Sequence, residues 1–166
     1  MRILGIDPGF AIVGCGVVEC ISAKFSLVDY GAVTTPAGMP MEDRLGTIYD
    51  QLSFAIEKYR PAAMAIEQLY FTSNQKTVIA VAQARGVLLL CAKKHDLPIF
   101  EYTPLQVKQA VVGYGRAEKA QVMEMTRRIL HLDHIPRPDD AADALAIAIC
   151  HGHTAGSQLA RYDNLR

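Results

Sequence analysis

The stretch "RILGIDPGFAIVGCGVVEC", residues 2–20, decides the fold. Its opening apolar run ends at Asp7 and is followed by a Pro-Gly turn pair, which predicts a short β-strand and a tight connection. "IVGCGVVEC" predicts a second strand, and "FSLVDYGAVTT", which is rich in β-forming residues, predicts a third. Because the connections between these strands are short, we expect an antiparallel meander.

Beyond the meander, predicted helices alternate with strands. Apolar residues recur at helical spacing from Met41 to Arg60, and "AAMAIE" predicts a buried strand that ends at Glu67. The remaining elements are a helix over residues 77–95, the strand "LPIFEY", and helices over "TPLQVKQAVVG", "AEKAQVMEMTRRILHL" and "DDAADALAIAICHGH". This order predicts an α/β fold with a mixed five-stranded sheet flanked by helices. We expect one domain over residues 1–153 and a flexible polar tail over residues 154–166.

The charges of the 166-residue chain are unevenly distributed, although its net charge is zero. Residues 1–70 contain five Lys or Arg and eight Asp or Glu, whereas residues 71–137 contain ten Lys or Arg and five Asp or Glu. A basic middle beside acidic clusters fits a protein that binds phosphate groups near a metal site. The same charges would also suit solvated helix surfaces, so this pattern leaves both interpretations open.

The cysteines and the apolar segments bear on where the protein acts. The four cysteines have no C-x-x-C spacing and most lie in apolar runs, which favours reduced, buried thiols in a cytoplasmic protein. None is spaced from the histidines as in a zinc finger. Only six residues precede Asp7, so we expect no secretory leader, and Gln83 and Arg85 interrupt the longest apolar stretch. We therefore predict a soluble protein without a membrane partner.

Acidic residues end two of the predicted strands. Asp7 ends the first strand and Glu67 ends the fourth. If these strands are parallel neighbours, both carboxylates lie side by side at the C-terminal edge of the sheet, where sites in such sheets usually form.

A third acidic group begins the last predicted helix, in "RPDDAADALAIAIC", residues 137–150. One Asp after Pro138 can cap this helix, and the helix dipole favours carboxylates in the first turn. Asp143 shares a helix face with Asp140 at i, i+3 and with Asp139 at i, i+4, so helical geometry does not choose between the two pairs. A solvated acidic turn would explain these residues, and so would a site in which a cation neutralises them.

A cation is the stronger interpretation once the three segments are considered together. Asp7, Glu67 and the acids of the last helix would repel one another at one edge of the sheet unless a metal ion bridged them. Ligands that are all oxygen point to Mg²⁺ or Mn²⁺ rather than zinc. Two such ions about 4 Å apart can hold the attacking and leaving oxygens of a phosphodiester.

Five motifs then give the chain a specific resemblance over residues 2–153. "GIDPGF", "AIEQLYF", "QARGV", "QVKQAVVGYGRAEKAQV" and "DDAADALAIAI" resemble the successive motifs of the RuvC family, the crossover junction endodeoxyribonucleases, in the family's order and spacing. The resemblance implies a ribonuclease H-like fold and a homodimer that uses Mg²⁺ to resolve four-way Holliday junctions in DNA recombination and repair. It implies paired nicks that leave 5′-phosphate and 3′-hydroxyl ends, and a partnership with the RuvA–RuvB branch-migration complex.

The resemblance also assigns the catalytic and metal-binding roles, to Asp7, Glu67, Asp140 and Asp143. The family has an acid three residues before its Asp-Ala-Leu-Ala segment, which selects Asp140 over Asp139. Some members carry His at that position, whereas this chain has Asp. Asp139 is then expected to be the N-cap of the last helix. The four acids would hold two Mg²⁺ ions, for which Mn²⁺ could substitute.

We predict DNA contacts from Tyr70, Phe71, Asn74, Lys76, Lys108, Arg116 and Lys119, of which the resemblance carries over Tyr70, Lys108 and Lys119. Asn74 and Lys76 lie in the predicted loop after Tyr70, where they could read sequence or bind the DNA backbone. The family usually has Phe where this chain has Tyr70, and either that ring or Phe71 could stack on a base. Lys108 and Lys119 match family lysines that would hold phosphate groups and offset charge on the leaving oxygen. "QARGV" resembles the dimer-forming helix, where Gly86 would permit close approach, although an ordinary core helix would be equally apolar.

Three other functions have to be weighed against this one. "GIDPG" resembles the first phosphate loop of actin-like and sugar-kinase domains, but those proteins have two such domains and a Gly-rich adenosine motif that this chain lacks. A non-catalytic junction-binding protein of the same fold would have no use for four intact acids. A nuclease of this fold acting on RNA is disfavoured by the "YGRAEK" and "QVKQ" matches. We therefore predict a Mg²⁺-dependent Holliday junction resolvase.

Overall fold

The structure, a computed structural model, describes the backbone of residues 1–69 and 75–163 and the side chains of residues 1–69 and 77–155. Within these ranges the predicted elements occur in the predicted order. The strands are β1 (Arg2–Asp7), β2 (Ile12–Ile21), β3 (Lys24–Thr34), β4 (Ala63–Glu67) and β5 (Ile99–Tyr102). The helices are α1 (Met41–Tyr59), α2 (Gln75–Lys94), α3 (Pro104–Val112), α4 (Lys119–Ile129) and α5 (Asp139–Asp163).

The strands form one mixed sheet in the order β3-β2-β1-β4-β5. The pairs β3–β2 and β2–β1 are antiparallel, as expected of a meander, whereas β1–β4 and β4–β5 are parallel. Ile6 of β1 pairs with Ile66 of β4, so these two strands end together. The predicted α/β fold with a mixed five-stranded sheet is confirmed, and the carboxyl ends of β1 and β4 are neighbours.

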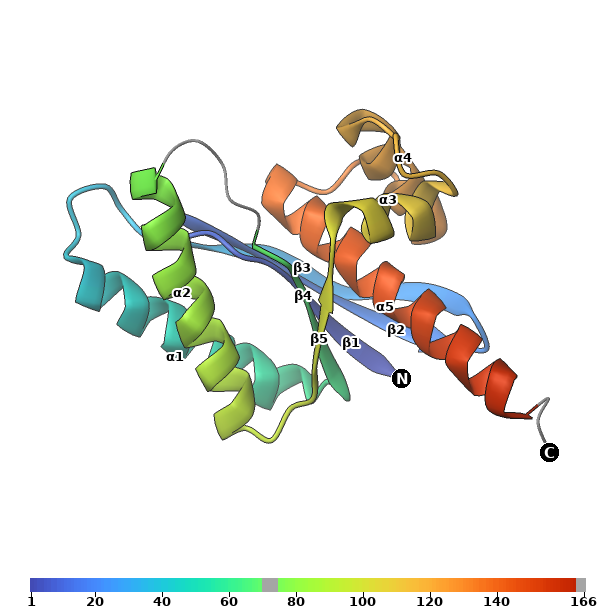
Figure 1. Cartoon of the computed structure of the whole chain (residues 1–166), viewed down its shortest axis with the longest axis horizontal. Coiled ribbons are helices and arrows are strands. Elements are labelled where there is room, and N and C mark those ends of the chain that lie inside the picture. The colour runs from blue at the N-terminus through green and yellow to red at the C-terminus, as the bar shows by residue number, and fades with distance from the viewer. Residues whose placement is uncertain (70–74, 164–166) are drawn as a thin grey trace.

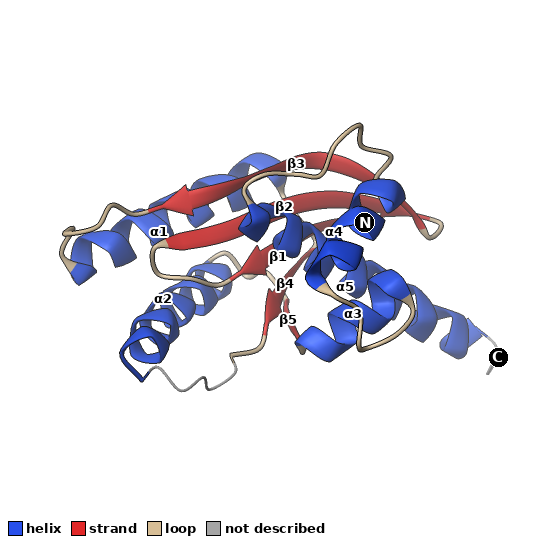
Figure 2. Ribbon diagram, turned by 90° about the horizontal axis from the view of Figure 1, so that it is seen from above, coloured by secondary structure: helices blue, strands red, loops and turns tan. Residues whose placement is uncertain are grey.

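The helices form two layers, one on each face of the sheet (Figures 1 and 2). α1 and α2 cover one face, and α3, α4 and α5 cover the other. Side chains alternate between the faces along each strand, so Ile6 packs toward α1 and α2 while Ile3 packs toward α5. By this alternation Asp7 lies on the face that Ile3 shares with α5. Glu67, two residues after the buried Ala65, lies on that face as well.

α5 lies close to the sheet because three glycines face it. An ideal Cβ on Gly5 of β1 would lie 1.9 Å from the backbone oxygen of Ala144. A Cβ on Gly14 of β2 would lie 2.0 Å from the backbone oxygen of Asp140, and Gly16 of the same strand also faces α5. Only residues without a Cβ allow the helix that contains Asp140 to rest directly on β1 and β2.

The starts of α3 and α5 differ in how they are capped. Thr103 caps α3: its hydroxyl accepts a hydrogen bond from the backbone N–H of Gln106 at 3.1 Å, and Gln106 Oε1 accepts one from the backbone N–H of Thr103 at 2.8 Å. The prediction that Asp139 is the N-cap of α5 was wrong, because Asp139 is already the first helical residue. Its carboxylate accepts a hydrogen bond from Arg137 instead.

The backbone of the last helix extends further than expected. α5 continues to Asp163, so residues 154–163 prolong the helix where we predicted a polar tail. The domain boundary at residue 153 and the flexibility of the tail stay predictions.

Two further expectations concern the cysteines and the membrane. All four cysteines are free, and Cys91 and Cys150 are buried as predicted, whereas Cys15 and Cys20 are half-buried. Burial raises the pKa of the Cys15 thiol to about 12. No helix in the described part of the chain is both long and apolar enough to cross a membrane.

Candidate active site

Three of the predicted acids meet in one cleft, of about 220 Å³, on the α5 side of the sheet. Asp7 borders it from the end of β1, Glu67 from the end of β4, and Asp143 from the beginning of α5. Strand pairing brings the first two together, and the close contact of α5 with β1 brings the third. The other lining residues all come from α3, α4 and α5, and are Pro104, Val107, Lys108, Lys119, Val122, Ala146 and Ile147.

Asp140, the fourth predicted acid, lies beside this cleft rather than among its lining residues. Its backbone rests against Gly14, which pairs with Asp7 across β1 and β2. Asp140 and Asp143 are i, i+3 on α5 and therefore share one face of that helix. The charge of Asp140 contributes to raising the pKa of Asp7. The structure thus brings all four predicted acids into one electrostatic cluster.

The carboxylates of this cluster repel one another, and their burial strengthens this repulsion. Burial is the largest of the causes that raise the pKa of Asp7 to about 7. The charges of Glu67, Asp143 and Asp140 raise it further, in that order. The pKa of Glu67 is raised as well, first by burial and then by Asp143. The charge of Lys119 opposes both shifts, but it does not cancel them.

Two predicted lysines enter the cleft from the helices opposite the strand ends. Lys119, the first residue of α4, donates a hydrogen bond from Nζ to Asp143 Oδ2 at 2.8 Å and lies 3.9 Å from Asp139 Oδ2. The bond to Asp143 is the main cause that raises the pKa of Lys119. Lys108 of α3 is half-buried and lines the same cleft.

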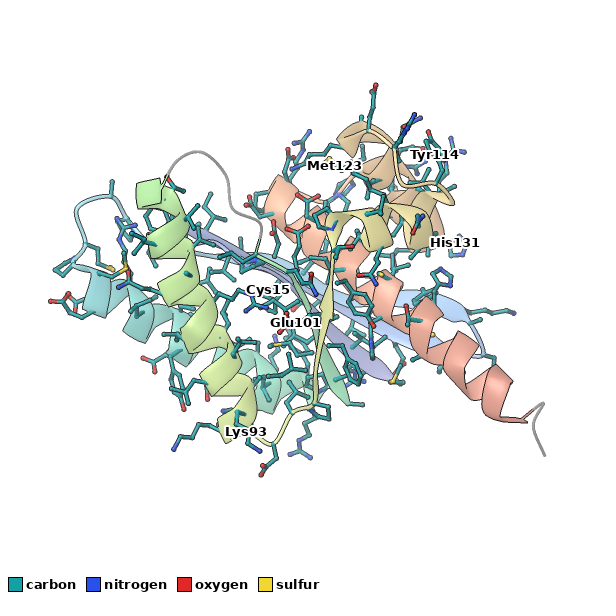
Figure 3. All side chains as sticks on the ribbon, in the orientation of Figure 1. Cys15, Lys93, Glu101, Tyr114, Met123 and His131 are labelled. Atoms are coloured by element: carbon teal, nitrogen blue, oxygen red, sulfur yellow. The ribbon has the colours of Figure 1, made fainter. Side chains whose placement is uncertain are left out.

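Gln121 holds the loop beside the cleft, and sequence reasoning missed it. Its Oε1 accepts hydrogen bonds from the backbone N–H of Glu118 at 2.8 Å and from the hydroxyl of Tyr114 at 2.9 Å. Both bonds tie the α3–α4 loop to the first turn of α4, where Lys119 begins the helix. Figure 3 labels Tyr114 at this loop, and Lys93 at the far end of α2 in the other layer. The spacing of Gln three residues after Glu118, typical of a capping pair, could have revealed it.

The other predicted DNA contacts are only partly described. Arg116 is exposed on the α3–α4 loop, outside the set of residues that line the cleft. Four predicted contacts lie outside the described residues, the last of them by its side chain only: Tyr70, Phe71, Asn74 and Lys76.

The carboxylates fit a cation by their chemistry, although they do not form a ready-made coordination shell. Among residues whose side chains are described, no group of three acidic, His or Cys side chains is placed to hold a metal ion as it stands. Asp143 bonds to Lys119 instead. However, the charge that raises the pKa of Asp7 is what a divalent cation would neutralise, and all candidate ligands offer oxygen, as Mg²⁺ and Mn²⁺ prefer.

The raised pKa of Asp7 predicts how the stability of the metal-free protein depends on pH. The folded protein keeps a proton on Asp7 up to about pH 7, whereas the unfolded chain releases it near the ordinary pKa of 3.8. Because the folded state binds more protons between these values, the free energy of unfolding falls as the pH rises from about 4 to about 7. We expect a loss on the order of 2 kcal/mol, after allowance for solvent screening of a half-buried carboxyl.

Urea unfolding of the metal-free protein at several pH values in this range measures the loss. Asp7→Asn has no such proton to release, so its stability should fall less over the same range. Equal pH dependence in both proteins would show that Asp7 titrates normally in the folded state.

Relatives of the chain are named for one activity. A model of the family "Crossover junction endodeoxyribonuclease RuvC" matches residues 3–151. The protein of that name from Ruminiclostridium cellulolyticum is 58% identical over 154 residues, which cover 93% of each chain. The one from Chloroflexus aurantiacus is 56% identical over 155 residues, which cover 93% of this chain and 94% of the relative.

A solved structure of a relative has the same fold. The structure of Thermus thermophilus RuvC matches with a TM-score of 0.89 and 37% identity, over 95% of this chain and 97% of that one. The structure of T. thermophilus RuvC in complex with Holliday junction substrate matches with a TM-score of 0.91 and 37% identity, over 95% and 96%. The predicted ribonuclease H-like fold is confirmed. The chain belongs to the RuvC family of crossover junction endodeoxyribonucleases.

Proposed function

We propose that this protein is a Holliday junction resolvase, an endonuclease that makes paired, symmetric nicks in four-way junction DNA during recombination and repair. The observation that carries the proposal is the cleft where Asp7, Glu67 and Asp143 meet beside two lysines. Relatives at more than 50% identity are named crossover junction endodeoxyribonucleases, and T. thermophilus RuvC has been solved with a Holliday junction substrate. A protein that only bound junctions would gain affinity from positive charge and lose it from a half-buried acidic cluster.

We propose that the cofactor is Mg²⁺, with Mn²⁺ as a substitute, and that two ions bind to Asp7, Glu67, Asp140 and Asp143. When bound, the cations would neutralise charge on the phosphate and lower the pKa of the attacking water. The raised pKa of Asp7 supports this role, because burial and the neighbouring acids disfavour its ionised form, which a bound cation would stabilise.

The protein's own groups would position the phosphate and balance its charge. Water attacks the phosphorus, the bond from phosphorus to the 3′ oxygen breaks, and that oxygen takes up a proton, which leaves 5′-phosphate and 3′-hydroxyl ends. Lys108 and Lys119 border the cleft from α3 and α4, where they would bind the phosphate and offset negative charge on the departing oxygen. We also propose DNA contacts from a stacking ring and three polar residues, namely Tyr70 or Phe71 with Asn74, Lys76 and Arg116.

Cleavage of a synthetic, end-labelled four-way junction in the presence of Mg²⁺ tests the proposal. We expect paired nicks at symmetric positions, ends that DNA ligase can seal, no cleavage of plain duplex of the same sequence, and no cleavage after metal is removed with a chelator. Junction binding without cleavage, with Mg²⁺ or Mn²⁺ and over several junction sequences, would favour the non-catalytic junction-binding protein.

The outward side of α2 supports a homodimer. Ile79 and Leu90 are large apolar side chains that are 61% and 53% exposed. Gly86 lies on the same side of the helix, and no atom lies within 4 Å of a Cβ placed on it. The opposite side of α2, with Ala84 and Leu88, is buried against the sheet and α1. Exposed apolar side chains on either side of a glycine suit close contact with the same helix of a second copy.

Leu90→Glu is therefore expected to turn the dimer into a monomer, because it would place a charge in an apolar interface. Light scattering during size-exclusion chromatography measures the mass. Phe54→Glu is the matched control: Phe54 is 60% exposed on α1, but it lines a groove with β2 and β3, away from α2. A Leu90→Glu protein that stays dimeric, or a Phe54→Glu protein that becomes monomeric, would show that the dimer forms through another surface.

By family analogy we also propose that the RuvA–RuvB branch-migration complex is a partner and that the protein acts in the cytoplasm. Junction cleavage measured with and without RuvA and RuvB tests the partnership, which predicts a change in the rate or the position of the nicks.

A further inference from the structure

Lys119 forms an ion pair although its side chain is largely exposed to solvent. Its side chain is 56% exposed, yet Nζ lies 2.8 Å from Asp143 and 3.9 Å from Asp139, both on a different helix. An exposed lysine gains little stability from such a pair and loses side-chain freedom. Gln121 Oε1 accepts a hydrogen bond from the backbone N–H of Glu118, which caps the turn that begins with Lys119.

The negative charge of the acidic cluster explains why Lys119 pairs with Asp143. Lys119 is the cation whose charge lowers the pKa of both Asp7 and Glu67. Within the described side chains, Asp143 has Lys119 as its only hydrogen-bond and ion-pair partner. Lys108 lines the same cleft without an ion pair to any described residue. Lys119 therefore supplies the positive charge that the metal-free cluster would otherwise lack.

We infer that Lys119 is the resident counter-ion of the metal-free site and that it competes with the divalent cation for Asp143. The inference rests on the proposed metal-dependent function. A cation on Asp143 and the ammonium group repel each other, even if each takes its own carboxylate oxygen. Metal binding would therefore release the ammonium from Asp143 into the cleft, where the phosphate of the DNA offers it a new partner. The same lysine would thus link the binding of metal to the binding of the scissile phosphate.

Isothermal titration of metal-stripped protein with Mg²⁺, without DNA, tests the competition. Lys119→Met keeps the length of the side chain and removes its charge, so we expect Mg²⁺ to bind about fivefold more tightly than to the wild type. Lys108→Met removes a charge from the same cleft without breaking an ion pair, and we expect less than about a twofold change. Unchanged or weaker Mg²⁺ binding by Lys119→Met, or an equal gain in both variants, would overturn the inference.

A second measurement, on the wild type, does not depend on whether the Lys119→Met protein folds. The Nζ NMR signals of Lys119 should shift during a Mg²⁺ titration more than those of Lys108, because only Lys119 changes its partner. Signals of both lysines that move together, or not at all while Mg²⁺ binds, would contradict the exchange. These measurements need no cleavage, so a protein that shows the competition without cutting junctions would refute the proposed function alone. A wild-type protein that binds no Mg²⁺ would refute both.

Discussion

Asp7→Asn is expected to slow junction cleavage by roughly three orders of magnitude, equivalent to about 4 kcal/mol of transition-state stabilisation. Asp7 is the residue on which the charges of all three other acids act, so it lies at the electrostatic centre of the cluster. Asn has nearly the same shape but cannot carry the charge that holds a cation. We therefore expect loss of catalysis without loss of the fold.

Junction binding should change little in the same variant, because DNA affinity comes mainly from contacts between basic groups and phosphates. Single-turnover cleavage and gel-shift titration of one labelled junction measure the two properties separately. Asp50→Asn, an exposed acid on α1 in the opposite layer, is the control and should cleave at the wild-type rate. Cleavage by Asp7→Asn within tenfold of the wild type would remove Asp7 from the catalytic set.

The order of the elements and the identity of the acids could be predicted because they are local properties of the sequence. Apolar runs that end in a single acid gave β1 with Asp7 and β4 with Glu67, and parallel pairing then required their carboxylates to be neighbours. The site acid at the start of α5 could not be identified in this way, because spacing along a helix does not choose between Asp139 and Asp140. The fold separates them: Asp139 bonds to Arg137, whereas Asp140 rests against β2.

Contacts between elements far apart in the sequence could not be predicted. Nothing local to Lys119 indicates that its side chain meets Asp143, 24 residues later, because that contact depends on how α4 packs against α5. From the sequence alone, the glycines of β1 and β2 are only strand residues. Gly14 and Gly16, two apart, share one face with Gly5, and this pattern could have indicated a strand surface on which another backbone rests.

Gly14→Ala is expected to damage both stability and catalysis, because β2 contacts the start of α5 at Gly14, and Gly14 pairs with Asp7 of β1. Its new Cβ would lie 2.0 Å from the backbone oxygen of Asp140 and 3.1 Å from Asp140 Cβ. Neither backbone is a flexible group, so the beginning of α5 has to move away from the sheet. We expect a loss of about 2–3 kcal/mol in the free energy of unfolding, as in other overpacked interiors.

The movement would displace Asp140 and Asp143 together, since both are on the first turns of α5. A displacement of about 1 Å is enough to cost roughly 100-fold in rate, so cleavage should fall by at least that factor at a temperature where the variant is fully folded. Gly31→Ala on β3 is the matched control, because no atom lies within 4 Å of its new Cβ and the change should be neutral or slightly stabilising.

Chemical unfolding and single-turnover cleavage of the two variants separate the effects on the fold and on the site. If Gly14→Ala is destabilised but cleaves normally, α5 tilts without moving its acids, and the glycine matters for packing alone. If it loses catalysis far beyond its loss of stability, then the distance between α5 and β2 sets the geometry of the four acids. We expect the second outcome, because Asp140 lies directly over Gly14 and Asp7 is its partner across the strand pair.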